Sequence, residues 1–311
     1  MLGKTAGGLF WMFRYLERSE NIARLIEAGF RIVLTRPGCE EWASVLKTAA
    51  ADQLYASQYG DIEQARVVDF LLRDPGNPSS VMSSFAQARQ NARLVRTAIT
   101  REVWEAVNDA YMSLKTRLAR PVAERDLPDV LAQIRRHSAL VRGALHGSML
   151  RNDVFDFCRL GTFLERADNT ARILDVKYYV LLPSVTQVGS SLDNVQWETI
   201  LRSVSGVRAY SWLNQGRARP MGIADFLIFD PRMPRSLRYS VTKIKSNLDM
   251  LEAQYAVRHP CHDTIQALDR CLTDGSVQQV FDDGLHEFLT GFLGNTNQLG
   301  AQIQTDFKFM E

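Results

Sequence analysis

The sequence predicts an all-α protein, and three observations support this fold class. Apolar residues recur at intervals of three or four along almost the whole chain of 311 residues, as they do on one face of a helix. No stretch shows a persuasive alternation of apolar and polar residues, which would mark a strand. The composition, 46% hydrophobic and 23% charged, is that of a globular chain that can bury a sizeable core.

Five helices are expected in the first half of the chain, separated by polar or Pro/Gly breaks. Pro37-Gly38 ends the first helix, and the Pro/Gly-rich segment 74–78 ends the third. Ser79 or Ser80 can cap the long fourth helix, in which a break near Thr100 is an open alternative. The predicted ranges are 8–32, 40–59, 61–73, 80–119 and 127–149.

Five more helices are expected in the second half. Pro183 and the polar stretch after it end the first of these. Segment 225–236 contains two prolines, so it is predicted to be a short irregular Pro-rich segment, with Ser236 as the cap of the next helix. The predicted ranges are 153–182, 194–215, 236–256, 263–272 and 276–309.

A repeated block indicates how these helices are organised. Residues 15–27, YLERSENIARLIE, align without a gap to residues 163–175, FLERADNTARILD, 148 positions later. Solenoid repeats have periods of roughly 20–50 residues, whereas this offset is close to half the chain. We therefore predict two pseudo-repeated helical-bundle halves, 1–150 and 151–311, packed into one body.

Each copy of the block places a polar stripe along one helix face, because positions i, i+3, i+4 and i+7 of a helix share a face. The opposite face of the first helix is apolar and can face a core. Both stripes have an acid at their first two positions, then Asn, then Arg. The stripes are Glu17, Glu20, Asn21 and Arg24 in the first copy, and Glu165, Asp168, Asn169 and Arg172 in the second.

Three interpretations of the stripes stay open at this stage. Charged residues at this spacing usually form a solvated face. If the stripes are covered instead, the acids need arginine partners, since an unpaired buried carboxylate is costly. A covered stripe is then either a structural polar network or a cleft for an anionic or zwitterionic ligand. The candidate partners are Arg14, Arg18, Arg24, Arg159, Arg166 and Arg172.

A second, basic stripe is formed by Arg89, Arg93 and Arg96, with Asn91 beside it. This pattern is typical of a solvated face. The alternative is that Arg89, Asn91 and Arg93 join the polar network as countercharges for its acids.

Composition narrows the choice of partners and compartment. With 37 basic and 35 acidic residues the net charge is +2, so no global field favours nucleic acid or a membrane surface as a partner. The four cysteines show no CxxC spacing and follow no secretory leader, and no apolar run is long enough to span a membrane. We expect a cytoplasmic protein.

No metal or intrinsic cofactor is expected. The repeat offers Glu-x-x-Glu and Glu-x-x-Asp without the histidines of a di-iron bundle, and neighbouring arginines compete with Mg²⁺ for the carboxylate oxygens. Nucleotide-binding and hydrolase motifs are absent. Catalytic residues are unknown. A stand-alone enzyme would have its active site between the two Glu-Arg helices, with Glu17 or Glu165 as general base or metal ligand.

Several motifs, in the same order along the chain, resemble the bacterial alpha-E family, a group of uncharacterised helical proteins with a Glu-Arg motif. The motifs are FWMFRYLERSENIAR at 10–24, ARQNAR at 88–93, WEAVN at 104–108, FLERADNTAR at 163–172 and FLIFDPRMPRS at 226–236.

This resemblance implies a setting for the chain. Family members are similar to proteins encoded beside, or fused to, a circularly permuted ATP-grasp protein, often with a transglutaminase-like partner. ATP-grasp enzymes use ATP and Mg²⁺ to activate a carboxylate for attack by an amine. The chain is then expected to be the helical partner or substrate-holding subunit of an amidoligase system, with an amino acid or peptide as its ligand. Its rivals are a stand-alone enzyme and a purely structural scaffold.

Overall fold

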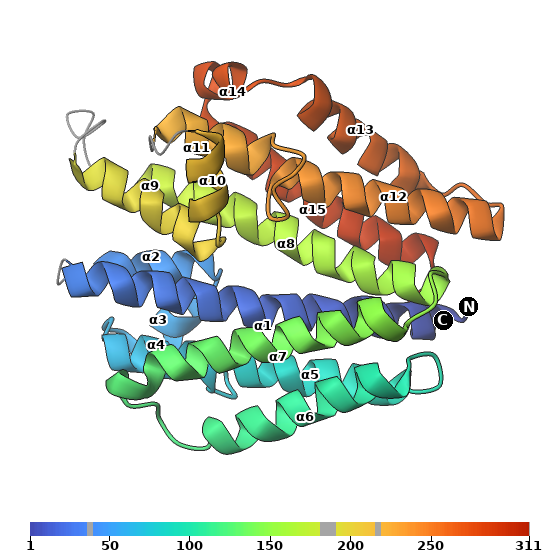
Figure 1. Ribbon diagram of the computed structural model, residues 1–311, viewed down its shortest axis with the longest axis horizontal. Coiled ribbons are helices and arrows are strands. Elements are labelled where there is room, and N and C mark those ends of the chain that lie inside the picture. The colour runs from blue at the N-terminus through green and yellow to red at the C-terminus, as the bar shows by residue number, and fades with distance from the viewer. Residues whose placement is uncertain (36–39, 181–190, 215–218, 311) are drawn as a thin grey trace.

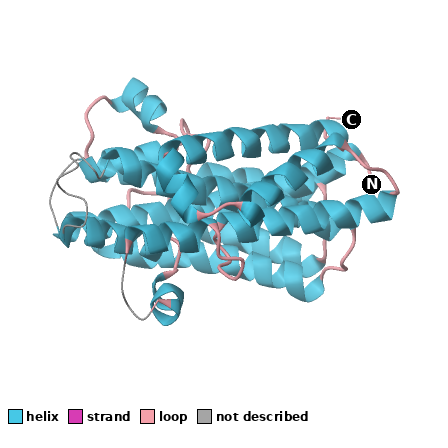
Figure 2. Ribbon diagram, turned by 90° about the horizontal axis from the view of Figure 1, so that it is seen from above, coloured by secondary structure: helices cyan, strands magenta, loops and turns pink. Residues whose placement is uncertain are grey.

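The computed structural model describes residues 1–35, 40–180, 191–214 and 219–310, and it is all-α throughout these residues (Figure 1). Figure 2, coloured by secondary structure, shows helices joined by loops across the described part of the chain. The predicted fold class is therefore confirmed. The helix ends expected at Pro37-Gly38 and Pro183 lie outside the described residues.

The helices follow one another along the chain with short connections. In order they are α1 (Gly3–Thr35), α2 (Glu40–Thr48), α3 (Asp52–Tyr59), α4 (Gln64–Leu72), α5 (Val81–Leu94), α6 (Arg101–Arg117), a 3-10 turn (Glu124–Asp126), α7 (Leu127–Ser148), α8 (Asp153–Val180), α9 (Ser191–Ser203), α10 (Val207–Leu213), α11 (Pro220–Ile228), α12 (Leu237–Tyr255), α13 (Pro260–Asp274), α14 (Val277–Asp283) and α15 (Leu285–Asp306).

Several predicted helices are interrupted. The break near Thr100 is confirmed, since the Thr100 hydroxyl caps α6 by accepting from the backbone N–H of Val103. Single residues with positive φ split three other predicted helices at Ala50, Ser205 and Gly284, because a positive φ cannot continue a right-handed helix. The predicted ranges 40–59, 194–215 and 276–309 were therefore wrong as single helices.

Segment 225–236 is only partly irregular, which corrects the prediction. Pro220 occupies the first helical position of α11, where a missing N–H costs no hydrogen bond, and the helix continues to Ile228. The turn that follows ends at Ser236, whose hydroxyl accepts from the backbone N–H of Tyr239 and caps α12 as expected.

Helices α1 and α8 form the centre of the molecule. They run side by side in the same direction and share the most extensive helix–helix interface (Figure 1). Helices α5 and α7 also pack on α1, while α12 and α15 also pack on α8. Both central helices are therefore covered on several sides, and the division of the chain at 150/151 stays a prediction.

Gly161 sets how closely the two central helices approach. A Cβ atom built on Gly161 would lie 2.1 Å from the backbone oxygen of Phe10. Any larger residue would collide with that backbone. The approach lies one turn before Arg14 on α1 and Glu165 on α8, so it brings the polar stripes of the two helices into contact.

Candidate functional site

The two Glu-Arg motifs bind each other across the α1–α8 interface. Arg166 donates from Nε and Nη2 to the two carboxylate oxygens of Glu17, both at 2.9 Å. Arg18 donates in the same way to Glu165, at 2.6 and 3.0 Å. Each glutamate thus receives a bidentate fork from the arginine of the other motif, the strongest geometry for such a pair. We call these two ion pairs the clasp.

Burial excludes the solvated-face interpretation for most of the two stripes. The glutamates of the clasp are 1% and 6% exposed, and Glu20, Asn21 and Asn169 are buried as well. Arg24, Asp168 and Arg172 are half-buried. Sequence periodicity could not show this, because a stripe of charged residues has the same spacing whether water or another helix covers it.

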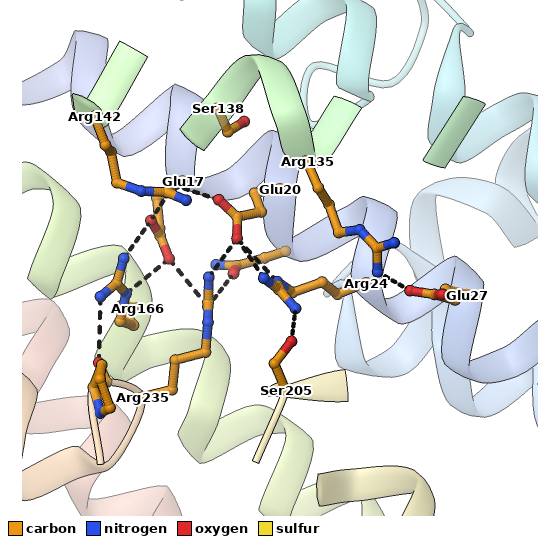
Figure 3. Close-up of polar contacts among 12 residues, drawn as sticks. Glu17, Glu20, Arg24, Glu27, Arg135, Ser138, Arg142, Arg166, Ser205 and Arg235 are labelled. Atoms are coloured by element: carbon orange, nitrogen blue, oxygen red, sulfur yellow. Dashed lines mark hydrogen bonds and ion pairs between the residues drawn. The ribbon is translucent and has the colours of Figure 1, made fainter. Parts of the chain in front are cut away.

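Two further arginines bind the acids of α1 (Figure 3). Arg235, from the turn before α12, places Nη1 at 3.1 Å from Glu17 Oε1 and donates from Nη2 to Glu20 Oε1 at 2.8 Å. Its Nη1 also donates to Asn21 Oδ1 at 3.0 Å. Arg142, from α7, bridges the carboxylates of Glu17 and Glu20. We call the site that Glu17, Glu20 and Asn21 form around the Arg235 side chain the Arg235 seat.

The remaining arginines of the stripes pair within or between the central helices. Arg24 donates to Glu20 from Nε and Nη2, at 3.0 and 2.7 Å. Arg172 likewise donates to Asp168, at 2.7 and 3.2 Å. Arg14 is the second cation on Glu165, with Nε at 2.8 Å from Oε2.

The basic stripe, of which Arg89 and Arg93 lie on α5, does not join this network, which corrects the countercharge alternative. Arg89 donates to Asn108 Oδ1 on α6 at 2.9 Å, and its guanidinium lies over the Tyr111 ring. Asn91 is half-buried and Arg93 is exposed, and neither forms an ion pair or side-chain hydrogen bond within the described residues. The stripe faces α6 and solvent.

Arg159 was also wrong as an expected partner of the acids. Its guanidinium contacts His146 and lies over the rings of Phe155 and Phe163, and it forms no ion pair with a described carboxylate. Arg142 and Arg235 pair with the acids of α1 instead. No periodicity marks Arg142, since it is one arginine among several on α7.

A signal for Arg235 does exist in the sequence. The segment DFLLRDPGNPSS at 69–80 aligns without a gap to DFLIFDPRMPRS at 225–236, 156 positions later. This is a second repeated block beside the Glu-Arg block. Comparing its two copies shows that Arg235 corresponds to Ser79 and Arg232 to Gly76, so two charges of the second turn have no match in the first.

The carboxylates of the clasp are held in their charged form. Burial opposes ionisation of Glu165, but the guanidiniums of Arg18 and Arg14 outweigh it and lower the pKa of Glu165 to about 2. Burial is likewise outweighed at Glu17, where Arg166 and Arg235 hold the pKa well below its ordinary value. A general base works best with a pKa near the operating pH, so neither glutamate is suited to that role.

These pKa shifts predict a loss of stability in acid. The pKa of Glu165 is about 2 in the folded protein against 4.5 for an ordinary glutamate. A depressed folded-state pKa stabilises the protein above the unfolded value, and this contribution is lost as the pH falls toward the folded value. We therefore expect the difference in unfolding free energy between the wild type and Glu165→Gln to shrink from pH 4.5 to about 2.

Urea denaturation of both proteins at a series of pH values measures this difference. The comparison with Glu165→Gln also removes the contribution of Asp156, whose pKa burial raises to about 6 and whose titration acts in the opposite direction. A difference that stays constant over the acid range would contradict the assignment of the stabilising charge to Glu165.

A pocket of about 180 Å³ opens beside the Arg18–Glu165 half of the clasp. Its polar walls are Arg18, Asn21, Glu165, Asp168, Asn169 and Arg172, and all of these except Arg18 belong to the two predicted stripes. Thr48, Ala49, Ala50 and Ser79 complete the lining with apolar residues of α1. We call it the open pocket. It offers both guanidinium donors and carboxylate acceptors, the combination that a zwitterion requires.

One wall residue of the open pocket has an unmatched hydrogen-bond donor. Asn21 is 3% exposed, and its Nδ2 has no partner. The orientation of the amide is fixed, because Oδ1 must face the guanidinium of Arg235 to accept its hydrogen bond. A buried donor without an acceptor is costly, and this one lies within the wall and is not exposed in the pocket.

Arginines outnumber acids around the clasp. Seven arginines pair with only four carboxylates, through contacts that link Arg14, Arg18, Arg24, Arg142, Arg166, Arg172 and Arg235 to Glu17, Glu20, Glu165 and Asp168. Two neighbouring pockets are also lined mainly by arginines and other polar groups. One, of about 260 Å³, has Arg24 in its lining, and the other, of about 340 Å³, has Arg166. This excess of positive charge favours a ligand with at least one anionic group.

Metal ligands do not gather in the described part of the chain, where no group of three or more His, Cys, Asp or Glu side chains could hold an ion. Arginines occupy the oxygens of the four carboxylates that were candidates for Mg²⁺, namely Glu17, Glu20, Glu165 and Asp168. None of the described helices combines the length and apolar character that a membrane span requires.

Comparison with known proteins places this architecture in a family. The chain is 22% identical, over 93% of its length, to an uncharacterized protein of Mycobacterium bovis and to uncharacterized proteins of two strains of Mycobacterium tuberculosis. It spans about a third, 35%, of the length of these relatives. No solved structure matches it. Residues 1–307 match the Alpha-E family, described as a predicted alpha-helical domain with a conserved ER motif, and the chain belongs to this family.

Proposed function

We propose that the chain is a non-catalytic, ligand-holding subunit of an ATP-grasp amidoligase system, and that it presents a small zwitterionic ligand from the open pocket. The observation that carries this proposal is the composition of the pocket, where guanidiniums and carboxylates meet. An amino acid or a short peptide offers an ammonium or other cation for the acids and a carboxylate for the arginines.

The ion pairs support a holding role rather than a catalytic one. Glu17 and Glu165 are each bound by at least two arginines and keep lowered pKa values, so they stabilise the pocket wall but do not accept protons near neutral pH. In this proposal the chemistry belongs to the partner, which forms an acyl phosphate from ATP and a carboxylate. The amine then attacks that acyl phosphate, and phosphate leaves.

The length of the relatives is compatible with such a partner. The chain corresponds to 35% of each of them, which leaves room for further domains in the same polypeptide. The resemblance to proteins encoded beside or fused to a circularly permuted ATP-grasp protein identifies the partner that we propose. A transglutaminase-like protein is a further candidate member of the system. Because this partner uses ATP, we place the complex in the cytoplasm.

Co-expression with the neighbouring ATP-grasp protein tests the proposal. We expect a complex that survives affinity purification, and ATP-dependent phosphate release that rises at least about tenfold when the chain is added. Arg93→Ala, a change on the exposed basic stripe, is the matched control and should leave both results unchanged. If no complex forms and phosphate release is the same with and without the chain, the proposal is wrong.

A further inference from the structure

The second repeated block forms the same local structure twice. Helices α4 and α11 both end at the same position of the block and lead into a turn with the sequence Asp-Pro-x-x-Pro-x-Ser. Asp74 Oδ1 accepts from the Gly76 N–H at 2.7 Å, and Asp230 Oδ1 accepts from the Arg232 N–H at 2.8 Å. The final serine caps the next helix in both copies. Ser79 and Arg235 therefore occupy the same place in the two turns.

A second pair of turns also corresponds. Helix α2 ends in a turn with Ala50 at φ 52°, and helix α9 ends in a turn with Ser205 at φ 57°. In each turn the next backbone N–H returns to a carbonyl five residues earlier, from Ala51 to Leu46 and from Gly206 to Leu201. Ala50 and Ser205 thus hold equivalent places beside the two central helices.

These correspondences make the open pocket the counterpart of the Arg235 seat. The seat contains Glu17, Glu20 and Asn21 of α1, and Arg24 there donates to Ser205 Oγ at 2.6 Å (Figure 3). The open pocket contains the equivalent residues of α8, namely Glu165, Asp168, Asn169 and Arg172. Arg235 and Ser205 fill the seat, whereas the open pocket has the shorter Ser79 and Ala50 at the equivalent positions.

We propose that the open pocket binds the guanidinium group of a small zwitterionic ligand, in the position that the Arg235 side chain occupies in the seat. This inference rests on the proposed function, whose ligand it names by class. The guanidinium is expected to bind Glu165, Asp168 and Asn169. In the seat, Arg235 forms an ion pair with Glu17 and donates to Glu20 and Asn21. The side chain of Asn169 has no hydrogen bond within the described residues, so it is available for this contact.

The seat shows that such a constellation holds a guanidinium despite the arginines around it. Burial, with Arg166 and Arg24 nearby, lowers the pKa of Arg235 to about 10, opposed by the charge of Glu17. The group is therefore still charged at neutral pH. The open pocket has an equivalent set of neighbours in Arg18 and Arg172.

The ligand also has to supply an oxygen acceptor. In the seat, Ser205 Oγ accepts from Arg24, whereas Ala50 offers no acceptor to Arg172. A carboxylate on the ligand would supply this acceptor and offset the excess of positive charge. L-arginine has both groups.

Isothermal titration calorimetry of the purified chain tests the ligand class. We expect L-arginine to bind one site per chain. Agmatine, which lacks the carboxylate, should bind at least about tenfold more weakly, and L-citrulline, which lacks the charge, should not bind. N-acetyl-L-argininamide tests whether the guanidinium comes from a free amino acid or from an arginine within a peptide. If it binds as tightly as L-arginine, the pocket is assigned to a peptide arginine, and the proposal of a free zwitterionic ligand is overturned.

Two variants test the location of the site. Ser79→Arg should place a guanidinium in the pocket and abolish arginine binding, whereas Arg93→Ala, on the exposed basic stripe, should bind like the wild type. Asp168→Asn, at a half-buried position, should weaken binding at least about tenfold. Unchanged binding by both Ser79→Arg and Asp168→Asn, equal binding of citrulline, or no binding of L-arginine at millimolar concentration would each overturn the proposal.

The outcome is separable from that of the proposed function. A complex with the ATP-grasp protein that raises its turnover, but no arginine binding, would refute only the ligand class. Arginine binding that Ser79→Arg abolishes, without any complex, would retain this site and refute the amidoligase role.

Discussion

Replacing Glu17 by glutamine is expected to lower the free energy of unfolding by about 3–5 kcal/mol. The carboxylate is 1% exposed and pairs with Arg166, Arg142 and Arg235. Glutamine keeps the size but loses the charge, so Arg166 is left without its anion, and Arg142 and Arg235 keep only Glu20 as a carboxylate partner. A typical domain is stable by only about 5–15 kcal/mol, so this one change removes a large part of the total. Urea denaturation followed by far-UV circular dichroism measures it.

The matched control is Glu105→Gln on α6. Glu105 forms its ion pair with Arg101 at the surface, where solvent screens the interaction, so the unfolding free energy should not change measurably. The double variant Glu17→Gln with Arg235→Gln also removes one of the positive charges that Glu17 balanced. Its loss of unfolding free energy should therefore be smaller than the sum of the losses in the two single variants. A loss of less than about 1 kcal/mol for Glu17→Gln would show that the clasp does not hold α1 and α8 together.

Gly161→Ala is expected to destabilise the protein by about 1–3 kcal/mol. The new methyl group would lie 2.1 Å from the Phe10 backbone oxygen, so α1 and α8 would have to separate. Their separation would lengthen the contacts of the clasp one turn further along. This expected sign is opposite to the intrinsic preference of a helix, in which alanine is favoured over glycine by about 1 kcal/mol.

Gly143→Ala on α7 is the control for this prediction. It also replaces a helical glycine, but a Cβ there has no neighbour within 4 Å. Its unfolding free energy should therefore rise by about 0.5–1 kcal/mol. Equal shifts in the two variants, in the same urea experiment, would show that the close approach at Gly161 does not limit the packing.

Some helix boundaries were predicted from the sequence, and others were missed. Ser236 and Thr100 were correctly identified as helix boundaries, because capping depends on the chemistry of a few neighbouring residues. The breaks at Ala50 and Ser205 were missed, because neither residue type favours a positive φ and only their tertiary surroundings hold them there.

The sequence alone determined the helical fold class and the importance of the two Glu-Arg motifs, because hydrophobic periodicity and a repeated block are local properties of the chain. It could not decide whether the stripes face water, since that depends on which helices cover them. Only the tertiary structure brought Arg142 and Arg235, far away in sequence, to the acids of α1. Only the tertiary structure, too, showed that Ser79 and Ala50 line the open pocket, at the positions that Arg235 and Ser205 hold in the seat. A pocket forms where side chains from several distant segments are too short to fill the space between them, and that depends on how those segments pack.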